Sequence, residues 1–101
     1  MFKNGMRPVH PGEILREDYL IPLNMSARAL AAALHVPAAR VNDIVRERRG
    51  ITADTAMRLA RYFRTDARSW LNLQAAFDLR VAEIKNAPRI FREIRPSAVP
   101  V

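Results

Sequence analysis

The chain has no cysteine, only three glycines and only two histidines. Without thiols there is no disulfide framework and no thiolate metal site, and two histidines far apart in the sequence make no imidazole cluster. The few glycines form no phosphate-binding loop, and no nucleophile stands in a catalytic motif. We therefore expect no catalytic residue, metal, cofactor or small-molecule substrate, and His10 is expected to cap a helix instead.

Long apolar segments are also missing. No run approaches the roughly 20 apolar residues needed to cross a bilayer, and residues 1–10 lack the apolar stretch of a signal peptide. We expect no membrane contact and a cytoplasmic protein. Half of the 101 residues are hydrophobic, which suffices for the core of one small domain.

Charge of one sign is in excess, with 17 basic and 10 acidic residues and a net charge of +7. Fifteen of the basic residues are arginines, which make bidentate contacts with phosphates and guanine, so a polyanionic partner is indicated. GC-rich coding is an alternative cause of the arginine bias, because alanine is also abundant. The distribution says more, since Arg40, Arg46, Arg48 and Arg49 lie in one short segment.

Apolar residues recur at helical spacing and no strand-like alternation occurs, which predicts an all-α fold of five helices. The predicted boundaries are His10 to Pro22, Ser26 to about Leu34, Ala38 to Gly50, Thr52 to Phe63, and Thr65 or Asp66 to just before Pro88. These helices form one domain of residues 10–86. A loose arm of residues 1–9 should precede it, and an irregular tail of residues 87–101 should follow it.

Residues 26–46 have the pattern of a helix-turn-helix, in which a tight turn joins two short helices. Ala31 allows the close approach of the helices, and Val41 and Ile44 hold the second helix on the domain. His35 stands at the left-handed turn position, where glycine is usual, at a strain cost of roughly 1 kcal/mol. Any helical bundle can contain such a turn, but the neighbouring arginines favour DNA binding over a purely structural interaction module.

The helix beginning at Ala38 is therefore predicted to enter the major groove of double-stranded DNA. Arg40 can bind guanine, Asn42 adenine and Asp43 cytosine, and a small side chain can touch the thymine methyl group. For Asp43, a salt bridge to Arg40 or Arg46 is an equal alternative. The predicted base contacts are Ala38, Ala39, Arg40, Asn42 and Asp43, and the predicted phosphate contacts are Ser26, Arg28, Arg46, Arg48, Arg49 and Thr52.

The fifth predicted helix carries more apolar residues than a small domain needs for its interior. They are either ordinary core residues or, in part, a two-fold interface between two copies of the chain. The predicted homodimer contacts are Trp70, Leu73, Phe77, Val81 and Ile84.

Three motifs along the chain resemble the HigA antitoxins, a group within the Xre and Cro-like helix-turn-helix proteins. These motifs are HPGEILREDYL at residues 10–20, RGITADTAMRLARYF at 49–63 and WLNLQAAFDLR at 70–80. The resemblance implies a lambda-repressor-like fold and a homodimer that binds operator DNA and represses its own operon. It also implies a protein partner, a HigB-like toxin that cleaves mRNA.

The resemblance also implies operator contacts on the residues given above and dimer contacts on the last helix and the following tail. The chain departs from the family pattern at His35 and Arg64, where glycines are common, and at Arg68, where an acidic residue is usual. The alternative function is a solitary Xre-type regulator, such as a phage or plasmid repressor, with no toxin partner.

Overall fold

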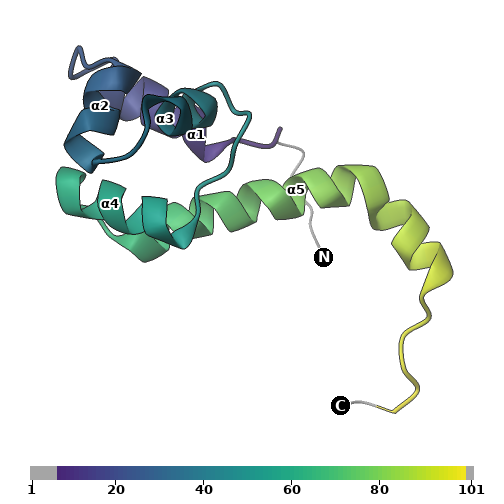
Figure 1. Cartoon of the computed structure of the whole chain (residues 1–101). Coiled ribbons are helices and arrows are strands. Elements are labelled where there is room, and N and C mark those ends of the chain that lie inside the picture. Colours follow the sequence, from purple (N-terminus) through teal and green to yellow (C-terminus); the bar gives the residue numbers. More distant parts are fainter. Residues whose placement is uncertain (1–6, 100–101) are drawn as a thin grey trace.

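The protein, described by a computed structural model over residues 7–99, is built from helices only in that range (Figure 1). The elements are α1 (Pro11–Ile14), η1 (Leu15–Leu20), α2 (Ala27–Leu34), α3 (Ala38–Val45), α4 (Ala53–Phe63) and α5 (Ala67–Glu93). Because η1 continues α1 without a break, there are five helical segments, which confirms the predicted all-α class. Most of the predicted N-terminal arm, residues 1–6, and residues 100–101 lie outside the described residues.

The first helix begins at His10, whose Nδ1 accepts a hydrogen bond from the Gly12 N–H at 2.8 Å, so the predicted cap is confirmed. From Leu15 onward the helix widens into π-helical turns, in which the Ile21 N–H donates to the Arg16 carbonyl at 3.0 Å. Gly12 lies directly against α3, and a Cβ at this position would be 1.8 Å from the Ile44 carbonyl oxygen. The first helix thus contacts the backbone of α3.

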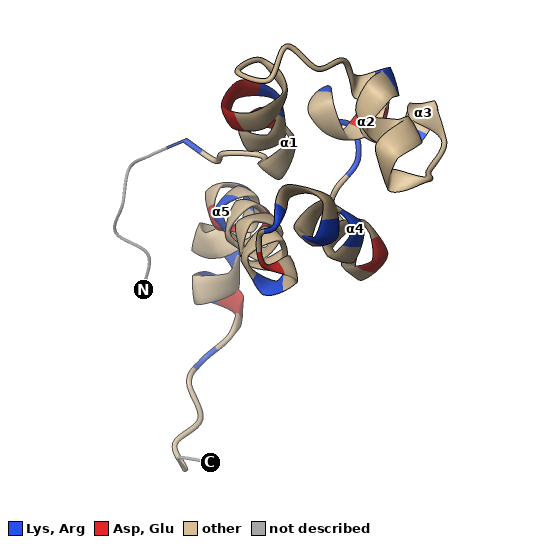
Figure 2. Ribbon diagram, turned by 90° about the vertical axis from the view of Figure 1, so that its left-hand side faces the viewer, with Lys and Arg blue, Asp and Glu red and all other residues tan. Residues whose placement is uncertain are grey.

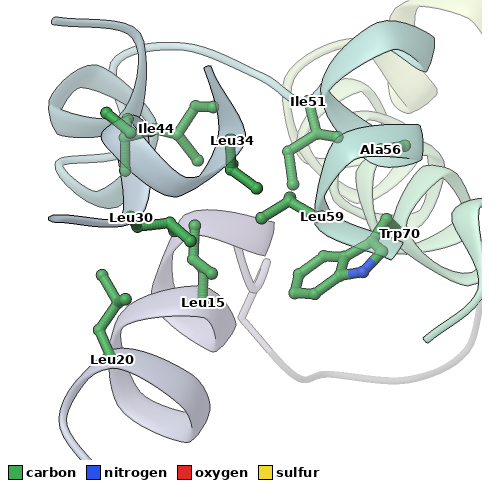
Figure 3. Packing of buried hydrophobic residues seen from close by; sticks show 11 residues of the cluster. Leu15, Leu20, Leu30, Leu34, Ile44, Ile51, Ala56, Leu59 and Trp70 are labelled. Atoms are coloured by element: carbon green, nitrogen blue, oxygen red, sulfur yellow. The ribbon is translucent and has the colours of Figure 1, made fainter. Parts of the chain in front are cut away.

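One hydrophobic core joins all of these elements. Leu15, Leu30, Ile44, Leu59 and Trp70 are each no more than 2% exposed. Figure 3 shows the side chains of α4 and α5 facing those of the first helix and α2 across the interior. Burying one such side chain contributes roughly 1.5–3 kcal/mol, so the core fixes α2 and α3 relative to the other helices.

Local capping sets most of the helix starts as predicted. Ser26 Oγ accepts from the Ala29 N–H at 3.0 Å, and Thr52 Oγ1 accepts from the Thr55 N–H at 3.4 Å. Of the two candidate caps for α5, Asp66 is the one used, because its Oδ2 accepts from the Ser69 N–H at 3.0 Å.

The end of α3 differs from the prediction. We expected Gly50 to close this helix, but α3 ends at Val45, and the residue with positive φ is Glu47, at 63°. The last turn is closed by the Arg48 N–H, which donates to the Asp43 carbonyl at 2.8 Å. Gly50 lies instead against the Gln74 side chain of α5, 2.9 Å from where its Cβ would be.

The prediction that α5 ends before Pro88 is wrong. The helix contains Pro88 and continues to Glu93, and the Ile94 N–H still donates to the Ile90 carbonyl at 2.9 Å. A proline removes one backbone donor and favours a bend, but it does not forbid the next turn. Figure 1 shows α5 projecting beyond the other helices and bending near its far end. Irregular structure therefore begins at Ile94, and no helix within residues 7–99 is long and apolar enough to cross a membrane.

Trp70, predicted at a dimer interface, is instead a core residue. It is 2% exposed, and its ring lies 5.3 Å from that of Tyr19. Its Nε1–H donates to Thr65 Oγ1 at 2.8 Å, so its polar atom is also satisfied inside the domain. Leu73 packs partly against the same core, and Phe77 lies edge-on to His10 at 4.8 Å. The first half of α5 thus packs against the other helices of the domain.

Candidate DNA interface

The turn between α2 and α3 has the geometry that a helix-turn-helix requires. His35 adopts the left-handed conformation, with φ 58° and ψ 47°, and ends α2. The Val36 N–H then donates to the Ala31 carbonyl at 3.0 Å, which closes the last turn of α2 directly before α3 begins. Ala31 is 1% exposed, so a larger side chain would separate the helices. The turn predicted around His35 is confirmed, although the residue is not glycine.

The burial pattern of α3 fixes which side faces outward. Val41 and Ile44 are each 1% exposed and anchor the helix on the core. The outer side contains three half-buried polar residues together with exposed Ala39 and Arg46. Ala38 is half-buried and packs against the core, so of the two alanines predicted to touch bases Ala39 is the more exposed. The polar residues of the outer side are Arg40, Asn42 and Asp43.

Two ion pairs involve this outer side. Arg40 Nη1 lies 3.0 Å from Asp54 Oδ2, at the start of α4. Asp43 Oδ2 lies 3.5 Å from Arg49 Nη2. Asp43 therefore pairs with neither of the two arginines that the sequence suggested, since its partner follows the helix instead of lying within it.

Asp54 connects α3 to the helix-turn-helix turn through a second arginine. Its Oδ2 also accepts from Arg58 Nε at 2.9 Å, and Arg58 Nη1 donates to the Leu34 carbonyl at 2.9 Å. Hydrogen bonds from Arg58, and then from Arg40, hold the pKa of the Asp54 carboxyl below its ordinary value. Asp54 and Arg58 stand four apart, which predicts a pair within α4, but nothing local indicated the contact with Arg40.

Arg16 is a second residue that the sequence analysis missed. Its Nη1 donates to the Val45 carbonyl at the end of α3, and its Nη2 lies 3.4 Å from Glu47 Oε2. A free carbonyl at a helix end is a natural partner for a guanidinium. The partners are about thirty positions apart in the chain, so only the folded structure reveals the contact.

The residues predicted to touch phosphates surround α3 at the surface. Ser26 and Thr52 cap the starts of α2 and α4, and Figure 2 shows basic segments on α2, α3 and α4. All six residues are exposed: Ser26, Arg28, Arg46, Arg48, Arg49 and Thr52. Helix starts and arginine side chains are the groups that proteins use against phosphate. In the described part of the chain, no three His, Asp or Glu side chains gather as a metal site would require.

Comparison with known proteins agrees with this geometry. Residues 15–70 match the family model described as Helix-turn-helix. Virulence-associated protein I of Dichelobacter nodosus is 67% identical over 80% of this chain and 75% of its own length. The structure of the Pseudomonas aeruginosa antitoxin HigA with the higBA promoter is 54% identical, with a TM-score of 0.87 over 89% of this chain and 98% of that one.

A third similar structure is the antitoxin GraA in complex with its operator. It is 48% identical, with a TM-score of 0.90 over 98% of this chain and all of GraA. These likenesses cover the helix-turn-helix and also the long last helix, since they extend over nearly the whole chain. The chain therefore belongs to the helix-turn-helix family and, within it, to the group of HigA-type antitoxins.

Proposed function

We propose that this protein is a cytoplasmic, sequence-specific DNA-binding repressor and the antitoxin of a HigB-like mRNA-cleaving toxin, and that it regulates its own operon. The observation that carries the DNA-binding part is the outer side of α3, where half-buried polar side chains lie close to exposed arginines. The neighbours HigA and GraA are described with promoter or operator DNA, which supports the same role here.

In the proposed complex, α3 lies in the major groove. Arg40, Asn42 and Asp43 read base edges, Ala39 contacts a thymine methyl group, and Ala38 lies at the edge of this contact because it is partly buried. The phosphates on either side are bound by the N-terminus of α2 and by the arginines after α3. The proposed phosphate contacts are Ser26, Arg28, Arg46, Arg48, Arg49 and Thr52.

The far half of α5 is the proposed contact between two copies of the chain. Ile84, Ile90 and Phe91 are 54%, 41% and 63% exposed, and with Leu79 they line an apolar groove. Phe77 and Val81 are half-buried, and they stand seven and three residues before Ile84, a spacing that places them on the same side of α5 as Ile84. A dimer brings two α3 helices to half-sites about one DNA turn apart. Phe91→Asp should therefore yield a folded monomer by sedimentation, whereas an unchanged dimer would move the interface elsewhere.

Binding to the DNA immediately upstream of the coding sequence tests the main proposal. With about six to ten phosphate contacts per dimer, affinity should fall roughly 10³- to 10⁵-fold between 50 and 200 mM salt. Arg40→Ala should weaken binding to this DNA by about 1–3 kcal/mol and relax the preference for one base. Arg68→Ala is the matched control, because this exposed arginine lies beyond the opposite end of α4 from Asp54.

Equal losses for the two arginine variants, or binding that ignores salt, would contradict this interface. The toxin partner is tested separately, by co-purification with the product of a neighbouring short reading frame. If no such frame encodes a toxin, the chain is a solitary regulator that uses the same DNA interface.

A further inference from the structure

Asp54 lies outside the helix-turn-helix, yet it contacts the recognition helix α3. Its carboxylate, at the start of α4, is 3.0 Å from Arg40 Nη1 of α3. We propose that Asp54 is a positioning residue, which orients the Arg40 guanidinium for recognition of guanine and so sets the base preference of the protein. This inference rests on the proposed function, because it concerns how α3 reads DNA.

The ion pair with Asp54 leaves available the N–H donors of Arg40 that a guanine contact needs. A guanine edge takes two N–H donors from one planar guanidinium, and a free arginine side chain reaches many rotamers in which those donors point elsewhere. Asp54 holds Nη1, and among residues 7–99 no hydrogen bond engages Nε or Nη2. The guanidinium is thus fixed through one nitrogen while its other donors stay available to a base.

Asp54 is itself held in place. Arg58 Nε donates to the same Oδ2 at 2.9 Å, and Arg58 Nη1 donates to the carbonyls of Leu34 at 2.9 Å and His35 at 3.5 Å. These carbonyls belong to the end of α2 and the turn, so the carboxylate is placed relative to the helix-turn-helix itself. A flexible acidic side chain would only neutralise the charge of Arg40, whereas an anchored carboxylate also fixes the orientation of the Arg40 guanidinium.

The negative charge of Asp54 should act differently on base selectivity and on general DNA affinity. The side chain is 58% exposed and stands beside residues proposed to meet phosphates, so its negative charge opposes DNA binding of any sequence. Any benefit of Asp54 to DNA recognition therefore lies in discrimination between bases. Loss of the carboxylate should therefore weaken the base preference and leave the general affinity for DNA equal or higher.

The test is selection from a library of randomised DNA duplexes, followed by binding to the selected duplex and to mixed-sequence DNA. The variants are Asp54→Asn, Arg40→Ala and the double variant, with Asp54→Ser as a second replacement if the amide variant unfolds. Asp18→Asn is the matched control, since Asp18 is an exposed carboxylate of η1 and the charge change is the same. Melting curves establish that each variant is folded.

The wild-type protein should enrich guanine at one position of each half-site. Arg40→Ala should reduce that enrichment about fivefold to hundredfold, which is the range for loss of one bidentate base contact. Asp54→Asn should reduce it at least about threefold at the same position only, with unchanged or tighter binding to mixed-sequence DNA. In the Arg40→Ala background it should have no further effect on the selected bases.

Unchanged base selection by Asp54→Asn would overturn the proposal, and so would a loss of equal size in the Arg40→Ala background. The second result would mean that Asp54 acts independently of Arg40. A wild-type protein that enriches no sequence would overturn the proposed function, and this inference with it, and that outcome is distinct from the other two.

Discussion

Gly12 is the point where the first helix touches the recognition helix, and Gly12→Ala tests how tightly this contact holds the domain together. An added Cβ would lie 1.8 Å from the Ile44 carbonyl oxygen and 2.8 Å from the carbonyl carbon. Backbone atoms cannot rotate away as a side-chain end can, so the two helices must separate by roughly 1 Å within a close-packed interior. The contact therefore admits glycine and no larger residue.

The cost follows from the packing. Overfilled sites lose about 1–3 kcal/mol, and a clash with backbone belongs at the upper end of that range. Alanine recovers up to about 1 kcal/mol by its better helix propensity. The expected net loss is about 2 kcal/mol, which lowers the melting temperature of a domain of this size by roughly 8–16 °C.

Gly50→Ala is the control, because it makes the same chemical change at the other described glycine. Its added Cβ would lie 2.9 Å from the terminal amide of Gln74, which can turn aside. The Gln74 Oε1 accepts from the Ile51 N–H at 2.7 Å, so the cost is at most the roughly 1 kcal/mol of one hydrogen bond. Thermal unfolding followed by far-UV circular dichroism compares the two variants. If Gly12→Ala melts within about 3 °C of the wild type, or no lower than Gly50→Ala, the contact between the two helices accommodates a Cβ after all.

Two further predictions concern the histidines. His10 is buried, and burial lowers its pKa below the ordinary 6.5, so the unfolded chain binds the proton more readily and stability should fall as the pH drops from about 6.5 toward 5. Urea unfolding at pH 7.5 and 5.5 measures this loss; His10→Asn, which keeps an N-cap acceptor, should flatten it, and an equal slope in the variant would assign the effect to another group. His35 has φ 58°, so His35→Gly should raise stability by up to about 1 kcal/mol while His35→Val should lower it by about 1–2 kcal/mol. The same urea denaturation assay ranks the stabilities of the wild type and the two variants. A glycine variant less stable than the wild type would mean that the His35 imidazole itself stabilises the fold.

The features that were predicted correctly from the sequence depend on interactions between residues only a few positions apart. The caps at His10, Ser26 and Thr52 are of this kind, because each side chain bonds to an N–H two or three positions later. The spacing of Val41 and Ile44 likewise settled which side of α3 is buried. The helix-turn-helix could therefore be predicted from short-range patterns alone.

The errors have long-range causes. Gly50 carries a typical helix-ending signal, but the carbonyl ends of α3 are instead bonded by the loop after Val45 and by Arg16. Trp70 and Ile84 lie on the same apolar helix, and only the packing of the other helices decides that the first is in the core and the second is exposed. The contact of Arg40 with Asp54 joins two helices, and local propensity contains no information about it.

Because α5 is long, the order of its C-terminal end should depend on whether the chain self-associates. The helix has 27 residues, and its buried residue is Trp70, in the first turn, so the turns around Pro88 have little of the chain's own core to rest on. An isolated helical end is marginal in water, and a proline removes one of the bonds that would hold it. Backbone amides beyond Ile84 should therefore exchange rapidly with deuterium in a lone chain and slowly in an assembled one. Concentration-dependent exchange protection at this end would measure self-association and helix formation as one coupled equilibrium.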